Sequence, residues 1–317
     1  DYQNILQKFS RVGRSLFADL FYPYKGDAQK NKQINEIGKR LSKISTGRTL
    51  TIQVLSDSFF IPWNLLYDGP QEKVEFQHFW GFKHIIEEIP HTSLAGPYVI
   101  DLPIKDRLRL GVNINRGIHA NSDVSRAVVG PQLNHLKTLN PPVNLQPRDN
   151  QREVLDMLRG QQQACQIEYF YCHGSTGLGD DYIDDSYLDI DGTLLSLRDI
   201  RLETLDRRFN HHPLFILNAC ESSQLDGRFY DGFATYFLSM GASAVLGAET
   251  EIPIQFGANF GITLIDTFYQ GRADKPDSAG YSLGEALLEV RKHFVEQYKN
   301  PLGLLYRTFG DADVCLT

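Results

Sequence analysis

The chain has 317 residues, of which 42% are hydrophobic, so it is long enough to bury one large core or two modest ones. Its 39 acidic residues outnumber its 32 lysines and arginines, which gives a net charge of −7, and the sequence has no long basic run. We therefore expect no direct binding to nucleic acid. The four cysteines, Cys165, Cys172, Cys220 and Cys315, show no metal-ligand spacing and are too few for a disulfide framework, which predicts a reducing, cytoplasmic compartment.

The first hundred residues predict a smaller N-terminal region of helices and strands. Apolar residues at helical spacing indicate helices over 3–20 and 29–44, and short apolar runs indicate strands over 49–55 and 84–89. The start is not a signal peptide, no apolar run approaches the roughly 18 residues of a membrane span, and the absence of an initial Met suggests a piece of a longer protein. We expect no membrane contact.

A boundary near residues 101–107 divides this N-terminal region, 1–100, from a catalytic domain, 101–317. The N-terminal region either packs on that domain or belongs to it. In the second part, apolar strand segments alternate with helical ones. The predicted strands are 108–114, 167–172, 214–218 and 243–248, and the predicted helices are 124–139, 150–158, 196–208, 229–240, 256–270 and 283–298. A proline-rich loop is predicted around 141–147. This alternation predicts an α/β fold with a mostly parallel sheet and helices on both faces.

Two of these strands end in residues that can carry chemistry. One ends at His173-Gly174, and the other ends in Asn218-Ala219-Cys220, so the cysteine follows the histidine by 47 positions. Open α/β sheets hold their sites at the carboxyl ends of strands. Caspases have their histidine about 50 residues before an Ala-Cys nucleophile motif, so both the spacing and the local sequence indicate a Cys-His pair.

Several blocks, in this order and spacing, resemble the CHAT family of caspase-like cysteine peptidases, relatives of caspases, separase and gingipains. The matching segments are Ile61 to Leu66, Tyr171 to Gly174, Leu188 to Leu197, Leu217 to Ser222, Gly241 to Gly247 and Phe309 to Asp311. They span about residues 49–317. The chain departs from the family at Asn64, where a Glu is usual, and at Ala248 to Glu251, where an apolar or Trp-containing stretch is usual.

The resemblance implies a cysteine endopeptidase. Cys220 would attack the scissile carbonyl, and His173 would activate the thiol and protonate the leaving amine. The backbone N–H groups of Gly174 and Cys220 would form the oxyanion hole. No cofactor and no metal are expected, and no third catalytic residue is evident. Taken alone, Cys220 would more often be a buried structural thiol, and it is the pairing with His173-Gly174 that favours a nucleophile. Cys172 should point to the opposite face, into the core.

Three residues are candidates for substrate binding. Asn218 should share the face of the strand that carries Cys220, and its alternative role is to cap the strand end. Relatives that cleave after basic residues often have an acidic residue at this position, so Asn218 is not expected to select Arg or Lys in that way. Glu249 and Glu251 follow the next strand and could select a basic side chain, or they could form a solvated loop face.

An acidic cluster between the two candidate catalytic residues invites a calcium interpretation. It comprises Asp180, Asp181, Asp184, Asp185, Asp189 and Asp191. The cluster lacks the ligand order of an EF-hand, so a flexible acidic loop is favoured over a metal site. Its last part, Asp189 to Gly192, predicts a hairpin turn.

We therefore expect a peptidase that cleaves a specific protein or peptide partner. Because relatives in this family occur in regulated bacterial defence and signalling systems, the resemblance also implies a regulatory protein or repeat module. The rival interpretation is an inactive caspase-like scaffold that binds protein without cleaving it. A third is an acyltransferase or other thiol hydrolase on the same sheet.

Overall fold

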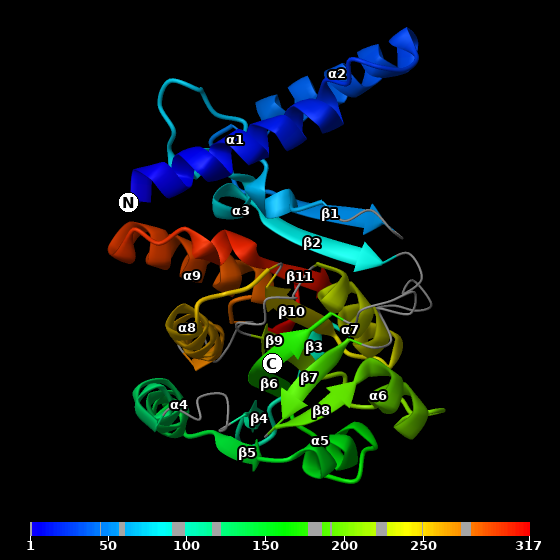
Figure 1. Ribbon diagram of the computed structural model, residues 1–317, viewed down its shortest axis with the longest axis vertical. Coiled ribbons are helices and arrows are strands. Elements are labelled where there is room, and N and C mark those ends of the chain that lie inside the picture. Colours follow the sequence, from blue (N-terminus) through cyan, green and yellow to red (C-terminus); the bar gives the residue numbers. More distant parts are fainter. Residues whose placement is uncertain are drawn as a thin grey trace.

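A ten-stranded sheet forms the centre of the molecule in the computed structural model, which describes residues 2–44, 46–56, 61–90, 99–115, 122–176, 186–190, 192–219, 227–248, 250–273 and 280–317 (Figure 1). Eight strands follow the order β1-β2-β11-β10-β9-β6-β4-β5, and the hairpin β7–β8 continues from β6. Their bounds are β1 Thr51–Ser56, β2 Ile85–Pro90, β4 Arg109–Ile114, β5 Asn144–Arg148, β6 Ile167–Ser175, β7 Tyr187–Ile190, β8 Thr193–Ser196, β9 Leu214–Ala219, β10 Ala244–Ala248 and β11 Tyr306–Gly310.

The sheet consists of two parallel blocks. In the larger block, β10, β9, β6, β4 and β5 all run in the same direction. In the smaller block, β1, β2 and β11 are parallel to one another, and the antiparallel pair β10–β11 joins the two blocks. The predicted mostly parallel sheet is confirmed, with the consequence that β6 and β9 end at the same edge.

Helices cover both faces of the sheet, as expected for strands that are apolar on both sides. One face carries α3 (Trp80–Lys83), α4 (Ser122–Lys137), α8 (Ile254–Ala273) and α9 (Leu283–Tyr298), which contact one another in sequence α3·α9, α9·α8 and α8·α4. The other carries α5 (Gln151–Leu158), α6 (Leu197–Glu203) and α7 (Gly227–Ser239). Figure 1 shows the two groups on the left and right of the sheet. The core between these layers is continuous from β4 to β11.

Local sequence explains where several of these elements begin and end. Ser196 and Ser282 each form a capping box with the residue three positions later, which fixes the first turns of α6 and α9. Helix α6 is shorter than the predicted 196–208, since Asp206 adopts a positive φ of 61° that a helix does not tolerate. The segment predicted as a proline-rich loop contains β5, and Pro147 is accommodated there because β5 is an edge strand that pairs only with β4.

The N-terminal region contributes strands to the same sheet. Helices α1 (Tyr2–Phe21) and α2 (Ala28–Ile44) pack together outside β1 and β2, at the top of Figure 1. Helix α1 lies so close to the segment around Leu65 that a Cβ atom on Gly13 would be 1.9 Å from the Leu65 carbonyl oxygen. Since β1 pairs with β2, and β2 pairs with β11 near the end of the chain, both strands of the N-terminal region belong to the main sheet. The remaining pair, β3 (Asp101–Leu102) with β12 (Cys315–Leu316), lies apart from it.

Two buried ion pairs lie within this architecture. Arg307 on β11 donates to both carboxylate oxygens of Glu88 on β2, across the smaller block. Arg148 on β5 donates to Glu168 on β6, with 2.7 Å between Nη1 and Oε2, and both side chains are at most 2% exposed. Among the described helices, none is long and apolar enough to cross a membrane.

Candidate active site

The candidate catalytic residues belong to the neighbouring parallel strands β6 and β9. Their register pairs Tyr171 with Asn218 and Cys172 with Ala219. His173 follows in β6 and is partly exposed, whereas Gly174 beside it is buried. Cys220 and Glu249 lie outside the described residues. The structure therefore shows one half of the predicted pair, His173, at the carboxyl edge of the sheet next to the end of β9.

The hairpin β7–β8 extends β6 beyond the sheet and fixes the surroundings of His173. His173 is paired with Asp189 and Gly174 with Leu188, in antiparallel register. Directly opposite residues have Cβ atoms about 4.5–5.5 Å apart, so Asp189 begins beside His173 on the same face. Its Oδ1 atom accepts a hydrogen bond from the Gly192 N–H at 2.9 Å, and Gly192 has φ +75°. The predicted hairpin turn is confirmed, and it was the proximity of Asp189 to His173 that sequence reasoning missed.

Asn218 lies in a buried hydrogen-bond network. Its side chain is 0% exposed. The Nδ2 atom donates to the Gly257 carbonyl at 2.6 Å and to the Tyr169 hydroxyl at 3.2 Å, and Oδ1 accepts from the Tyr306 hydroxyl at 2.7 Å. These contacts connect the carboxyl end of β9 to α8, β6 and β11. The amide is thus engaged on both its donor and its acceptor side within the protein.

The start of α8 is tied to the same edge of the sheet. The Tyr171 hydroxyl donates to the Ile254 carbonyl at 3.1 Å, and the Asn218 amide holds Gly257 one turn later. The segment between β10 and α8 is therefore anchored at its far end. Glu251 lies in that segment and is exposed. Alternation along β6 puts Tyr169, Tyr171 and His173 on one face, so the two tyrosines could have been found from the sequence.

Asn64, the departure noted in the N-terminal block, is also buried and lies near this network. Its Nδ2 donates to the Tyr306 carbonyl at 2.8 Å. Arg291 on α9 donates to the same carbonyl, to the Gly81 carbonyl at 3.1 Å and to the Gly303 carbonyl at 3.0 Å. Asn64 thus supports the backbone of β11, whose tyrosine hydroxyl contacts Asn218.

The described residues contain no group of three or more His, Cys, Asp or Glu side chains arranged to hold a metal ion. Of the acidic cluster considered for calcium, only Asp189 lies within the described residues, and its carboxylate is bonded to the hairpin backbone. Cys172 is fully buried, as expected for a core residue.

Comparison with known proteins agrees with this architecture. The CHAT domain family matches residues 120–301. A probable protease from Vitiosangium sp. (strain GDMCC 1.1324) is 27% identical over 241 residues, which cover 73% of this chain but only 29% of that protein, so the chain spans less than a third of this relative's length. The Arg-specific cysteine proteinase gingipain R superposes with a TM-score of 0.53 at 12% identity, over 99% of this chain and 76% of that one. A structure described only as a protease superposes with a TM-score of 0.54 at 11% identity, over 90% and 68% of the two chains. With more than half of its length matched by the family, this chain belongs to the CHAT domain family and has a caspase-like fold.

Proposed function

We propose that the chain is a cysteine endopeptidase in which Cys220 is the nucleophile and His173 the general acid and base. The observation that carries the proposal is the register of β6 and β9, because Cys172 is the partner of Ala219. Cys220 and His173 each follow these residues by one peptide bond. Consecutive Cα atoms are about 3.8 Å apart and neighbouring strands about 4.8 Å apart, so this register allows the two side chains to come into contact.

In this mechanism His173 accepts the proton of the Cys220 thiol, and the resulting thiolate attacks the peptide carbonyl. The imidazolium then protonates the departing amine, and an acyl-enzyme remains until water hydrolyses it with the imidazole acting as base. The oxyanion would be held by the backbone N–H groups of Gly174 and Cys220. Gly174 presents no side chain, which leaves room for the carbonyl to approach the backbone.

For substrate selection, the proposal separates two roles. Glu251, which is exposed beyond β10, and Glu249 would contact the substrate and favour a basic residue at the cleavage position. Asn218, which is 0% exposed and bonded to three partners, would act indirectly by holding α8 against β9. The substrate would be a protein or peptide, cleaved under the control of a regulatory protein or repeat module in a bacterial defence or signalling system in the cytoplasm.

The test combines substrate cleavage with thiol labelling. A proteome-derived peptide library is incubated with wild type, Cys220→Ala and His173→Ala, and new termini are identified by mass spectrometry. General acid–base catalysis contributes about 10²–10⁴ in rate, so His173→Ala should lower kcat by about that factor. His135→Ala is the matched control, because it removes the same kind of side chain from α4, where the imidazole lies beside Asp266 and has no part in the proposed mechanism. A preference for Arg or Lys that disappears in Glu251→Gln would support the selection role.

Cleavage that persists in Cys220→Ala would contradict the proposal. If wild type cleaves nothing, a peptide electrophile decides between a peptidase awaiting its activator and an inactive scaffold. Labelling of Cys220 that is lost in His173→Ala supports the peptidase, whereas an unreactive Cys220 in the folded protein supports the scaffold. Release of an acylated product in place of free termini would indicate an acyltransferase.

A further inference from the structure

Two adjoining pockets lie at the amino edge of the sheet, opposite to His173. The first has a volume of about 220 Å³ and is bounded by the end of α5, the start of β6 and the loop after α6. The second, of about 260 Å³, is bounded by the segment that leads into β4 and by the residues just before β6. Both are lined by Ala164, Asn210 and His211, so they meet at these residues. With a rise of about 3.3 Å per residue, Glu168 in the first pocket is about 17 Å along β6 from His173.

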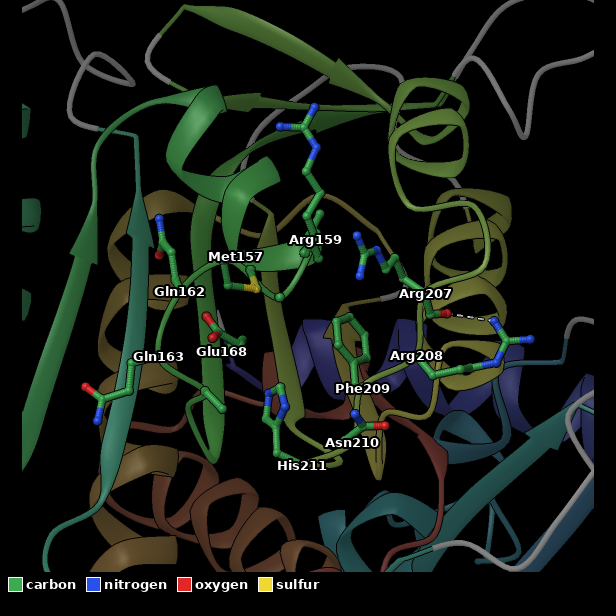
Figure 2. A pocket seen from close by; sticks show the side chains of 13 residues that line it. Met157, Arg159, Gln162, Gln163, Glu168, Arg207, Arg208, Phe209, Asn210 and His211 are labelled. Atoms are coloured by element: carbon green, nitrogen blue, oxygen red, sulfur yellow. Dashed lines mark hydrogen bonds between the residues drawn. The ribbon is translucent and has the colours of Figure 1, made fainter.

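Positively charged side chains line both pockets, although the net charge of the chain is −7. Arg207 lines the first, and Figure 2 shows its guanidinium turned toward the cavity, while Arg208 extends away from it. Lys105 and Arg109 line the second. Among the described residues, no carboxylate forms an ion pair with Lys105, Arg109 or Arg207.

The negative groups near these cations are already engaged. Glu168, on the wall of the first pocket, is held by both terminal nitrogens of Arg148 at 2.7 and 3.3 Å and by the Asn113 amide. Arg159, which also lines this pocket, forms ion pairs with Asp156 and with Glu203, where Nη2 and Oε2 are 2.5 Å apart. The charge of Lys105, Arg109 and Arg207 therefore remains available to a ligand.

His211, which lines both pockets, has a pKa that is lowered by its surroundings. Burial, together with the neighbouring His212 and Arg109, lowers the pKa of His211 to about 4. His211 is therefore neutral at pH 7 and can donate or accept a hydrogen bond without adding charge. The Arg109 guanidinium is oriented by its own Nε atom, which donates to the Ala164 carbonyl at 2.6 Å, so its terminal nitrogens are left for other acceptors.

We propose that these pockets form one binding site for a nucleotide, with Arg207, Arg109 and Lys105 binding its phosphate groups. Guanidinium groups match phosphate oxygens with paired hydrogen bonds, and lysine adds a compact positive charge. The first pocket also offers the apolar Met157 and the Asn210 amide, which suit the base and sugar of such a ligand. Together the two volumes reach the lower part of the range of about 300–1,000 Å³ found for small-molecule pockets.

The experiment is calorimetric titration of the whole chain with ADP and, separately, with inorganic pyrophosphate at constant ionic strength. Arg207→Gln and Lys105→Gln should each weaken binding at least tenfold. Arg40→Gln, which removes the same charge from an exposed position on α2, should leave it unchanged. Lys105 is exposed and takes part in no described hydrogen bond or ion pair, so Lys105→Gln should leave the fold intact.

Binding of ADP tighter than pyrophosphate supports the nucleotide site, and binding equal to that of pyrophosphate restricts the site to phosphate and overturns the nucleoside part. Equal affinities in the Arg207→Gln and Arg40→Gln proteins, or a Kd weaker than about 1 mM for both probes, would overturn the site altogether. The outcome is independent of the proposed peptidase, because His173→Ala should bind both probes like wild type.

Discussion

Replacing Asn218 with Asp tests whether this residue supports the sheet edge or contacts the substrate. The substitution keeps the shape of the side chain and exchanges the amide NH₂ for an oxygen. The new oxygen would face the Gly257 carbonyl, now 2.6 Å from Nδ2, and the Tyr169 hydroxyl, which already donates to Gln132 at 2.9 Å. The bond from the Tyr306 hydroxyl survives.

The expected cost follows from these contacts. Two acceptors lose their donor in a site that is 0% exposed, and each unsatisfied buried group costs about 1–3 kcal/mol, so the free energy of unfolding should fall by roughly 2–6 kcal/mol. Burial raises the pKa of the introduced carboxyl above its unfolded value of about 3.9. The variant is therefore least destabilised below that value, where the protonated carboxyl can donate to Gly257, and loses stability as the pH rises through the folded pKa.

Urea unfolding followed by circular dichroism at pH 5 and pH 8 measures both effects. Asn4→Asp, at an exposed position in α1, is the control and should change stability by less than about 0.5 kcal/mol. An Asn218→Asp protein that unfolds at the wild-type urea concentration at both pH values, but cleaves with a changed residue preference, would refute the supporting role and favour a substrate contact.

Three further predictions concern stability. Arg148→Met should lower the free energy of unfolding by about 3–5 kcal/mol by leaving the Glu168 carboxylate buried and unpaired, and adding Glu168→Gln should recover part of that loss in urea unfolding. Gly13→Ala should lower the melting temperature because its Cβ would clash with the backbone, whereas Gly130→Ala in α4, which has open space, should raise it or leave it unchanged; equal effects would contradict the tight approach of α1. Burial lowers the pKa of His84 to about 4, so the stability that depends on its neutral form should be complete above about pH 6.5 and decline between there and pH 4. A His84→Asn protein should show a flatter profile over that range, and an unchanged slope would refute this assignment.

The sequence by itself determined the order and nature of the main elements and the identity of the candidate catalytic pair. Apolar runs and their alternation with helical segments are local properties, so β4, β6, β9, β10 and the helices between them could be predicted within a few residues, except for the end of α6. The ends of β6 and β9 were recognisable because a buried strand stops abruptly at a polar or small residue. His173 and Cys220 could therefore be proposed as the catalytic pair without a structure.

Only the tertiary structure decided which strands are neighbours and what surrounds their ends. Pairing between β2 and β11 joins residues more than 200 positions apart, and no local pattern encodes such a contact. The same holds for Tyr306, whose hydroxyl reaches Asn218 only because β11, β10 and β9 are aligned in one sheet. The two pockets at the amino edge likewise form where separate loops meet. Lys105 and Arg207 are about a hundred positions apart in the sequence, and only folding places them on adjoining pockets.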